Sequence, residues 1–180
     1  EKYAFENCVM LSKISINGTL EFLGNKAFYE TPIMDEENYE NGALYIDGIL
    51  VDVLENEVSG EFEIKTGTYL LADGAFDVCK KVTNVIIPDT VKYIGDKCFF
   101  GCKELRTLYI PKTVEKIGEE IFESAYEYIV IKGELNSVSH LYSIENGIPF
   151  SSTDESSEYN VDFELVEKMA ESEYDVLIFA

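Results

Sequence analysis

The sequence predicts an α/β solenoid, in which short repeated turns of chain stack on one another around one elongated core. Two observations predict it. A 23-residue period runs through most of the chain, and phenylalanine recurs at one place in that period. The composition permits such a core, since 46% of the 180 residues are hydrophobic and 13% are aromatic. A unit this short cannot bury its own apolar face, so it must stack on its neighbours.

The period is clearest in two adjacent segments that align without a gap, DGAFDVCKKVTNVIIPDTVKYI and DKCFFGCKELRTLYIPKTVEKI. Residues of the same type recur 23 positions apart in the pairs Phe76/Phe99, Cys79/Cys102, Pro88/Pro111, Ile94/Ile117 and Gly95/Gly118.

The phenylalanine series extends to Phe122 and, earlier in the chain, to Phe5 and Phe28. Phe28 and Phe76 are 48 residues apart, which is two periods plus an insertion of two residues. One degenerate turn accounts for this interval, and Val53 is the candidate for its phenylalanine position. We therefore expect about six turns, with the phenylalanines forming an internal spine.

Residues 94–117 indicate how one turn is built. Alternation around Leu108 and Ile110 predicts a short strand with these two side chains inward, and strands of successive turns would stack in parallel about 4.8 Å apart. Pro111 lacks an N–H group and ends the strand. Asp96 is a candidate helix N-cap and Gly101 a candidate C-terminal glycine, which together predict a single helical turn.

Residues 151–180 differ from the array. They begin with a polar stretch, continue with Leu165, Val166, Met169 and Ala170 at helical spacing, and end in the strand-like run 176–179. From residue 150 onward the sequence has nine acidic residues and one basic residue. We expect this tail to be an acidic, helix-containing C-terminal cap; the alternative is the start of another module.

The composition also excludes several functions. A net charge of −21 argues against nucleic acid as a partner. No apolar run approaches the roughly 18–20 residues of a membrane helix, so we expect no membrane insertion. We also expect that any export signal has been removed or lies outside this sequence. One histidine and four cysteines without a Cys-x-x-Cys pair offer little for metal or thiol chemistry, and we expect no enzyme activity and no cofactor.

The repeat resembles the BspA-type leucine-rich repeat, whose pattern is A-F-x-x-C-x-x-L-x-x-I-x-I-P-x-x-V-x-x-I-G. Residues 75–95 match it nearly throughout. Asn41–Ile46 is similar to a hairpin-bearing repeat found inside such arrays, and Asn146–Phe150 to the segment on which they end. The resemblance implies a right-handed leucine-rich-repeat solenoid over residues 1–150, mainly short parallel strands with short helical turns, and a degenerate or hairpin-bearing repeat at about 35–60.

The resemblance also implies a function. BspA-type proteins are secreted or surface-anchored bacterial proteins that bind macromolecules of hosts or neighbouring cells. It thus implies an adhesin-like recognition module with a protein or glycan ligand, which we expect to be monomeric or weakly self-associating. The alternative is a rigid structural spacer within a longer surface protein.

The open face of the parallel sheet is the predicted binding platform, because its strand positions project regularly. The outward positions are Lys13, Ser15, Asn84, Ile86, Thr107, Tyr109, Val130 and Lys132. Ile86 and Tyr109 would be neighbours on adjacent turns, and such a pair serves either as a recognition anchor or as ordinary cross-strand packing.

Three other features leave alternatives open. Cys8, Cys79 and Cys102 share one repeat position, so Cys79 and Cys102 are either within disulfide range or small buried apolar residues; Ala125 at the same position favours burial. Residues 80–116 hold eight bases against four acids, which either orients an acidic ligand or only keeps the array soluble. His140 is expected on the surface, and the acidic segments 35–38 and 154–162 lack the spacing of a calcium loop.

Overall fold

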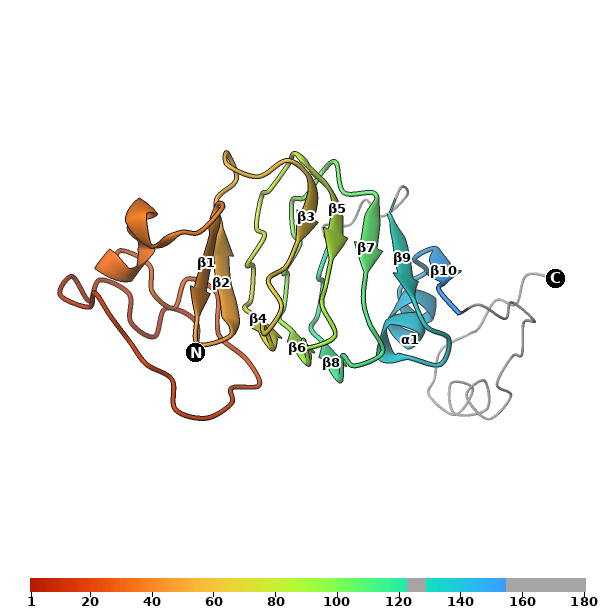
Figure 1. Cartoon of the computed structure of the whole chain (residues 1–180), viewed down its shortest axis with the longest axis horizontal. Coiled ribbons are helices and arrows are strands. Elements are labelled where there is room, and N and C mark those ends of the chain that lie inside the picture. The colour runs from red at the N-terminus through yellow and green to blue at the C-terminus, as the bar shows by residue number, and fades with distance from the viewer. Residues whose placement is uncertain (123–128, 155–180) are drawn as a thin grey trace.

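The structure, a computed structural model, describes residues 1–122 and 129–154. These residues form a solenoid whose two walls are five-stranded sheets (Figure 1). The wall called sheet A here contains, in spatial order, β1 (Ala43–Ile46), β2 (Ile49–Val53), β4 (Leu70–Leu71), β6 (Tyr93–Ile94) and β8 (Lys116–Ile117). Sheet B contains β10 (Phe150–Ser152), β9 (Val130–Gly133), β7 (Thr107–Tyr109), β5 (Val82–Ile86) and β3 (Gly60–Glu63).

The strands of sheet B pair in parallel, and β5, β7 and β9 do so in the 23-residue register. Ile86 lies beside Tyr109 and Tyr109 beside Lys132, and the alternation predicted for this strand is confirmed. Leu108 and Ile110 are fully buried, and β7 ends before Pro111. The described part of the chain is therefore a stacked repeat from β3 onward.

The predicted phenylalanine spine is also confirmed. The ring centroids of Phe76 and Phe99 lie 5.0 Å apart and those of Phe99 and Phe122 lie 6.1 Å apart. Phe5 and Phe28 stack at 5.5 Å in the first two turns. These distances lie in the range in which aromatic pairs attract, so neighbouring turns are joined through their rings as well as through their backbones.

The degenerate repeat contains the expected hairpin. β1 and β2 pair antiparallel, and the two residues between them, Asp47 and Gly48, have φ of 46° and 80°. Positive φ at both positions is what a two-residue hairpin turn requires. The Cys79 thiol donates to the carbonyl of Val53 at 3.5 Å, as the Cys102 thiol does to that of Phe76 at 3.2 Å. Val53 therefore takes the phenylalanine position, as predicted.

The predicted helical turns are wrong. Lys97 and Gly101 have φ of 54° and 77°, and Gly74 and Val78 of the preceding turn have 66° and 57°. Two left-handed residues four positions apart fold each segment into successive tight turns instead of a helix. In the described ranges the one α-helix is α1 (Val138–Glu145), with two 3-10 segments, η1 (Pro32–Met34) and η2 (Glu36–Asn38).

Asp96 does not cap its own turn. Its Oδ1 accepts the N–H of Glu119 in the following turn at 2.8 Å, and Oδ1 of Asp73 accepts the N–H of Asp96 at 3.0 Å. The carboxylates thus form a ladder between turns, in which each one satisfies a backbone donor of its neighbour.

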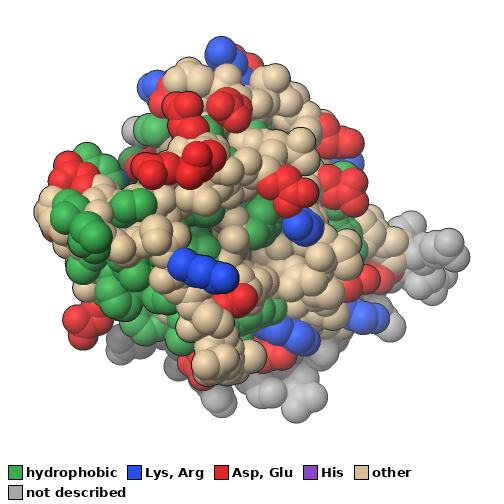
Figure 2. Space-filling model, turned by 60° about the vertical axis from the view of Figure 1, so that its left-hand side comes forward, with side chains coloured by type: hydrophobic (Ala, Val, Ile, Leu, Met, Phe, Trp, Pro, Cys, Tyr) green, Lys and Arg blue, Asp and Glu red, His purple; other side chains and the backbone are tan. Residues whose placement is uncertain are grey.

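The N-terminal part departs most from the prediction. Residues 12–16 and 36–39 form no strand, so each sheet has five strands where about six turns were expected. Six of the large apolar side chains that remain exposed belong to this part: Tyr3, Phe5, Val9, Met10, Phe22 and Tyr29. Figure 2 brings this end forward and shows apolar side chains on its surface between acidic ones. The acidic tail lies outside the described residues, as does Ala125.

Candidate functional site

The open face of sheet B brings six of the eight predicted residues together. They form two columns across the strands, one of Asn84, Thr107 and Val130 and one of Ile86, Tyr109 and Lys132. Between the two columns lie the buried residues Val85, Leu108 and Ile131, one in each turn. The columns are thus a consequence of the alternating pattern along each strand.

The two columns continue beyond the predicted residues. Glu61 pairs with Asn84 and Glu63 with Ile86, while Ser151 pairs with Lys132 at the other end. The face therefore has acidic side chains at its β3 end, an apolar and aromatic centre, and a lysine at β9. The sequence could have predicted Glu61 and Glu63 as members of these columns. Ile64 aligns with Ile87 in the 23-residue repeat, so the two glutamates align with Asn84 and Ile86.

Tyr109 stands at the centre of this face and is half-buried. Burial raises the pKa of its phenol, and the carboxylates Glu134 and Asp89 raise it further. The hydroxyl therefore stays protonated at neutral pH and offers both a donor and an acceptor beside the aliphatic Ile86.

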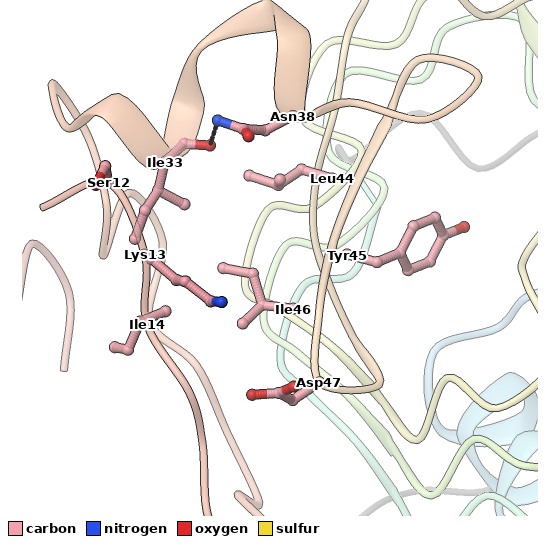
Figure 3. A pocket seen from close by; sticks show the side chains of 9 residues that line it. All are labelled: Ser12, Lys13, Ile14, Ile33, Asn38, Leu44, Tyr45, Ile46 and Asp47. Atoms are coloured by element: carbon pink, nitrogen blue, oxygen red, sulfur yellow. Dashed lines mark hydrogen bonds between the residues drawn. The ribbon is translucent and has the colours of Figure 1, made fainter.

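Lys13 and Ser15 do not join these columns. Residues 12–16 run beside the hairpin at the other end of the molecule, where the Ile16 N–H donates to Oδ2 of Asp47 at 2.7 Å. Lys13 there lines a cavity of about 240 Å³ between residues 12–14, η1 and β1 (Figure 3). The 23-residue alignment gives Lys13 the same position in its turn as Asn84, but sheet B ends at β3 and does not reach Lys13.

The lysines of the predicted basic band are partly neutralised. Three of them form ion pairs with acids of neighbouring segments: Lys80 with Glu55 at 2.9 Å, Lys92 with Glu115 at 3.2 Å and Lys97 with Glu120 at 3.0 Å. Each pair is largely exposed, and exposed pairs contribute only about 0–1 kcal/mol to stability. Their main effect is to reduce the charge with which this band attracts an acidic ligand.

Comparison with known proteins agrees with the stacked geometry. The family model of the BspA type leucine rich repeat region matches in six copies, over residues 1–47 and 55–154. The chain belongs to the BspA-type leucine-rich-repeat family. Searches of curated proteins and of solved structures gave no match.

The four cysteines of this BspA-type array are free thiols. Cys79, Cys98 and Cys102 are buried and Cys8 is exposed; none forms a disulfide. Burial, and after it the carboxylates of Asp52, Glu55 and Asp77, raises the pKa of the Cys79 thiol to about 12. Burial also raises the pKa of Cys98 and of Cys102. A protonated thiol is a poor nucleophile, so all three serve as small buried groups, and Cys79 and Cys102 also donate to the neighbouring turn.

His140 and Ser137 of the BspA-type array belong to the start of α1. Ser137 is its N-cap and accepts the His140 N–H, while Nδ1 of His140 accepts the N–H of Asn136 at 3.1 Å. The imidazole lies 4.7 Å from the ring of Phe150 and is half-buried rather than fully on the surface. Burial lowers its pKa. Both residues hold the helix in place.

The described ranges contain no group of three or more His, Cys, Asp or Glu side chains arranged to hold a metal ion. Among the helices that the structure describes, none has the length and hydropathy to cross a membrane. Repeats of this family are generally non-enzymatic modules and are typical of bacterial surface proteins.

Proposed function

We propose that this BspA-type module is a non-enzymatic recognition element, at the bacterial cell surface or secreted, that binds a protein or glycan of a host or neighbouring cell. The ligand lies across the two columns of sheet B. The observation that carries the proposal is the register of β5 with β7, which sets Ile86 beside Tyr109 at the centre of the open face.

The chemistry of this face suits recognition. Tyrosine combines a rigid aromatic surface with a hydrogen-bonding group and is enriched among the residues that dominate binding energy. Asn84 and Thr107 flank the pair with side chains that both donate and accept. Glu63 and Lys132, on either side of Ile86 and Tyr109 in the same column, give the face a direction along which a charged ligand is oriented.

A binding assay with a matched control tests the proposal. The wild-type chain and the variants Tyr109→Ala and Tyr93→Ala are applied to immobilised matrix proteins, fibronectin among them, and to a glycan array. Tyr93 is a half-buried tyrosine of sheet A, on the opposite wall. We expect Tyr109→Ala to lose at least about tenfold in affinity, a loss of about 1.4 kcal/mol, while Tyr93→Ala binds like the wild type.

Thermal unfolding of the same variants separates binding from packing. If Tyr109→Ala lowers the melting temperature without changing binding, Tyr109 is a packing residue and the platform is not on this face. If the wild type binds none of the surfaces, the rigid spacer is the better description. The stacked rings of Phe76, Phe99 and Phe122 favour that second function, since they join three successive turns to one another.

A further inference from the structure

The third turn of the solenoid, the one around Val53, takes a shorter path than the others at one corner. The corner is the segment that leads from a strand of sheet A to the phenylalanine position. Phe76 follows Leu71 by five residues, whereas Val53 follows Leu50, the partner of Leu71, by three. β2 runs straight through this segment and pairs with β1 as far as Val53. The third turn therefore lacks the corner that the second and fourth turns have.

A cavity of about 300 Å³ lies where that corner is missing. Residues 23–29 of the second turn line one side of it, residues 72–74, 77 and 78 of the fourth turn line the other, and Val51 and Asp52 of β2 lie between them. Beside the cavity the Asp73 N–H donates to the Leu23 carbonyl at 2.9 Å, so the second and fourth turns are in direct contact there. The cavity is thus bounded by the two turns on either side of the shortened one.

Both sides of the cavity carry backbone groups that are paired elsewhere in the array. The corner N–H groups of the fourth turn donate to carbonyls of the fifth turn at 2.8–2.9 Å. Lys26 has the same left-handed backbone as Gly74, with φ of 56° and 66°, so the second turn has the same corner geometry. In the described ranges, however, the N–H groups of Lys26 and Phe28 donate to no group, and the carbonyls of Asp73 and Asp77 accept from none. Backbone groups at buried positions are nearly always paired, so these four indicate an absent partner.

The charged side chains around the cavity favour a basic occupant. Three acids line it, Asp52, Asp73 and Asp77, against one base, Lys26. In the part of the chain that the structure describes, none of the three carboxylates forms an ion pair. Burial raises the pKa of the Asp52 carboxyl group, and the charge of Asp77 raises it further, so the two carboxylates repel each other. A cation held between them would relieve this repulsion.

Tyr29 and Asp77 indicate where in an occupant the positive charge belongs. Each directly follows the phenylalanine of its turn, Phe28 or Phe76, so the two share one position of the repeat. Both line the cavity, and Tyr29 is 43% exposed. A side chain at the equivalent position of an inserted corner would lie between them. An arginine there meets an aromatic face on one side and a carboxylate on the other, and both contacts are favourable for a guanidinium group.

We propose that this cavity binds a short basic peptide segment of a partner protein, which follows the path of the missing corner and places an arginine between Tyr29 and Asp77. Its carbonyls accept from Lys26 and Phe28, and its N–H groups donate to the carbonyls of Asp73 and Asp77. Small side chains suit its other positions, because the exposed surface of the cavity is mostly apolar and β2 lies behind it. The lining residues do not belong to sheet B, so this site is independent of the proposed function.

A synthetic peptide tests the site. The probe is fluorescein-labelled Ser-Gly-Ala-Ala-Arg-Gly-Ser with a C-terminal amide, titrated into the full chain and followed by fluorescence anisotropy. Its glycines stand four residues apart, as do Lys97 and Gly101, whose left-handed backbone shapes the corner of the fifth turn. We expect saturable binding that weakens at least about tenfold in Asp77→Lys. The matched control Asp89→Lys makes the same charge change at an exposed residue outside the cavity and leaves the affinity unchanged.

Two further peptides separate backbone pairing from charge attraction. A peptide with glutamate in place of arginine binds the wild type weakly and regains affinity for Asp77→Lys. A peptide with sarcosine in place of both glycines keeps the charge but loses two N–H donors, so it fails to bind either protein. Hydrogen exchange at the amides of Lys26 and Phe28 slows when the first peptide binds. The amides of Tyr3 and Phe5, which already donate to the second turn, do not change.

The proposal is overturned if the first peptide does not bind the wild type, if it binds wild type and Asp77→Lys equally, or if the sarcosine peptide binds as well as the first. Melting temperatures show whether both charge variants are folded. Should Asp77→Lys unfold, Asp77→Asn takes its place, because it removes the charge without changing the size of the side chain, and equal binding to it and to the wild type likewise overturns the proposal. Failure here leaves the matrix-protein assay of Tyr109→Ala unaffected.

Discussion

Residues 1–58 and residues 60–122 carry the same 23-residue period but make different structures from it. In the second region every turn contributes a strand to each sheet, and the phenylalanines of the repeat position, Phe76, Phe99 and Phe122, are almost completely buried. In the first region the turns around Phe5 and Phe28 keep their ring contact and their backbone bonds to each other, yet no parallel strand of either sheet forms before β2.

The difference shows that the pattern of a strand is not sufficient to make one. Leu11, Ile14 and Ile16 have the apolar spacing of the later turns. A strand also needs a neighbour to pair with, and the second turn replaces its own by η1, η2 and the β1–β2 hairpin. One irregular turn thus removes sheet B both from itself and from the first turn, which precedes it.

The largest expected effect compares phenylalanines at the same repeat position. Phe99 is 1% exposed between Phe76 and Phe122, and Phe5 is 38% exposed with Phe28 on one side only. Phe99→Ala should lower the free energy of unfolding by about 3–5 kcal/mol, because it removes a fully buried ring and leaves a cavity. Phe5→Ala should cost about 1 kcal/mol or less. Urea unfolding followed by circular dichroism measures both, and equal losses would remove the distinction between the regions.

A smaller effect is expected at the glycine that lets neighbouring turns approach. A Cβ at Gly95 would lie 2.5 Å from the backbone nitrogen of Asp73, so Gly95→Ala should force two turns apart and cost about 3 kcal/mol. At Gly18 a Cβ meets nothing within 4 Å, and only its φ of 111° opposes a side chain, which costs about 1 kcal/mol. The melting temperatures of the two variants should differ in this order. A Gly18→Ala variant that melts lower than Gly95→Ala contradicts the close stacking described for the array.

Asp52, on the hairpin of the first region, gives a pH-dependent effect. Burial raises the pKa of its carboxyl group and the nearby charge of Asp77 adds to this, although the Tyr39 hydroxyl donates to it at 2.7 Å. A raised pKa in the folded state favours folding below the pKa of the unfolded chain, and this contribution is lost as the pH rises through the folded value.

Asp52→Asn should therefore raise the melting temperature at neutral pH, and the gain should shrink in mild acid as the wild-type carboxyl becomes protonated. The amide oxygen still accepts from Tyr39, whereas the control Asp52→Ala loses that bond. Differential scanning calorimetry across this pH range measures the change. A gain that grows toward acid would mean that Asp52 is stabilised as a carboxylate.

The smallest expected effect does not involve stability. It concerns the accessibility of the cysteine thiols to a reagent. Cys8 and Cys79 share a repeat position, but Cys8 is exposed and Cys79 is buried with a raised pKa. Iodoacetamide at mildly alkaline pH should alkylate Cys8 and leave the other three cysteines unmodified, because their thiols stay protonated and covered. Mass spectrometry of peptides counts the adducts, and the denatured chain should gain four. Modification of Cys102 in the folded chain would indicate that the array opens.

Much of the regular region was predictable from single residues. The in-and-out order of Leu108 and Ile110, the ring contacts of Phe99 and the role of Val53 all follow from the repeat period. The tight turns that replace the predicted helical turns were not predictable. Lys97 and Val78 adopt left-handed backbone, which is unusual for these residue types, and nothing in the local sequence indicates it.

The candidate site divides in the same way. The strand register assigned the six residues between Asn84 and Lys132 to one face, since their turns are complete. The prediction placed Lys13 on the open face of the sheet. A strand forms at residues 12–16 only if the second turn supplies a partner strand, and it does not. A local signal did exist there: Asp47-Gly48 between two apolar runs is the sequence of a two-residue hairpin, and a hairpin interrupts a parallel ladder.

The carboxylate ladder from Asp73 through Asp96 to Glu119 bears on how such a molecule changes length in evolution. Each aspartate accepts a backbone N–H of the coil that follows its own. A duplicated coil therefore brings the acceptor that the next coil needs, and its own N–H is accepted by the aspartate of the coil before it. Gene segments encoding whole coils can therefore be gained or deleted without loss of fit, whereas a change of a few codons inside a coil shifts every later contact.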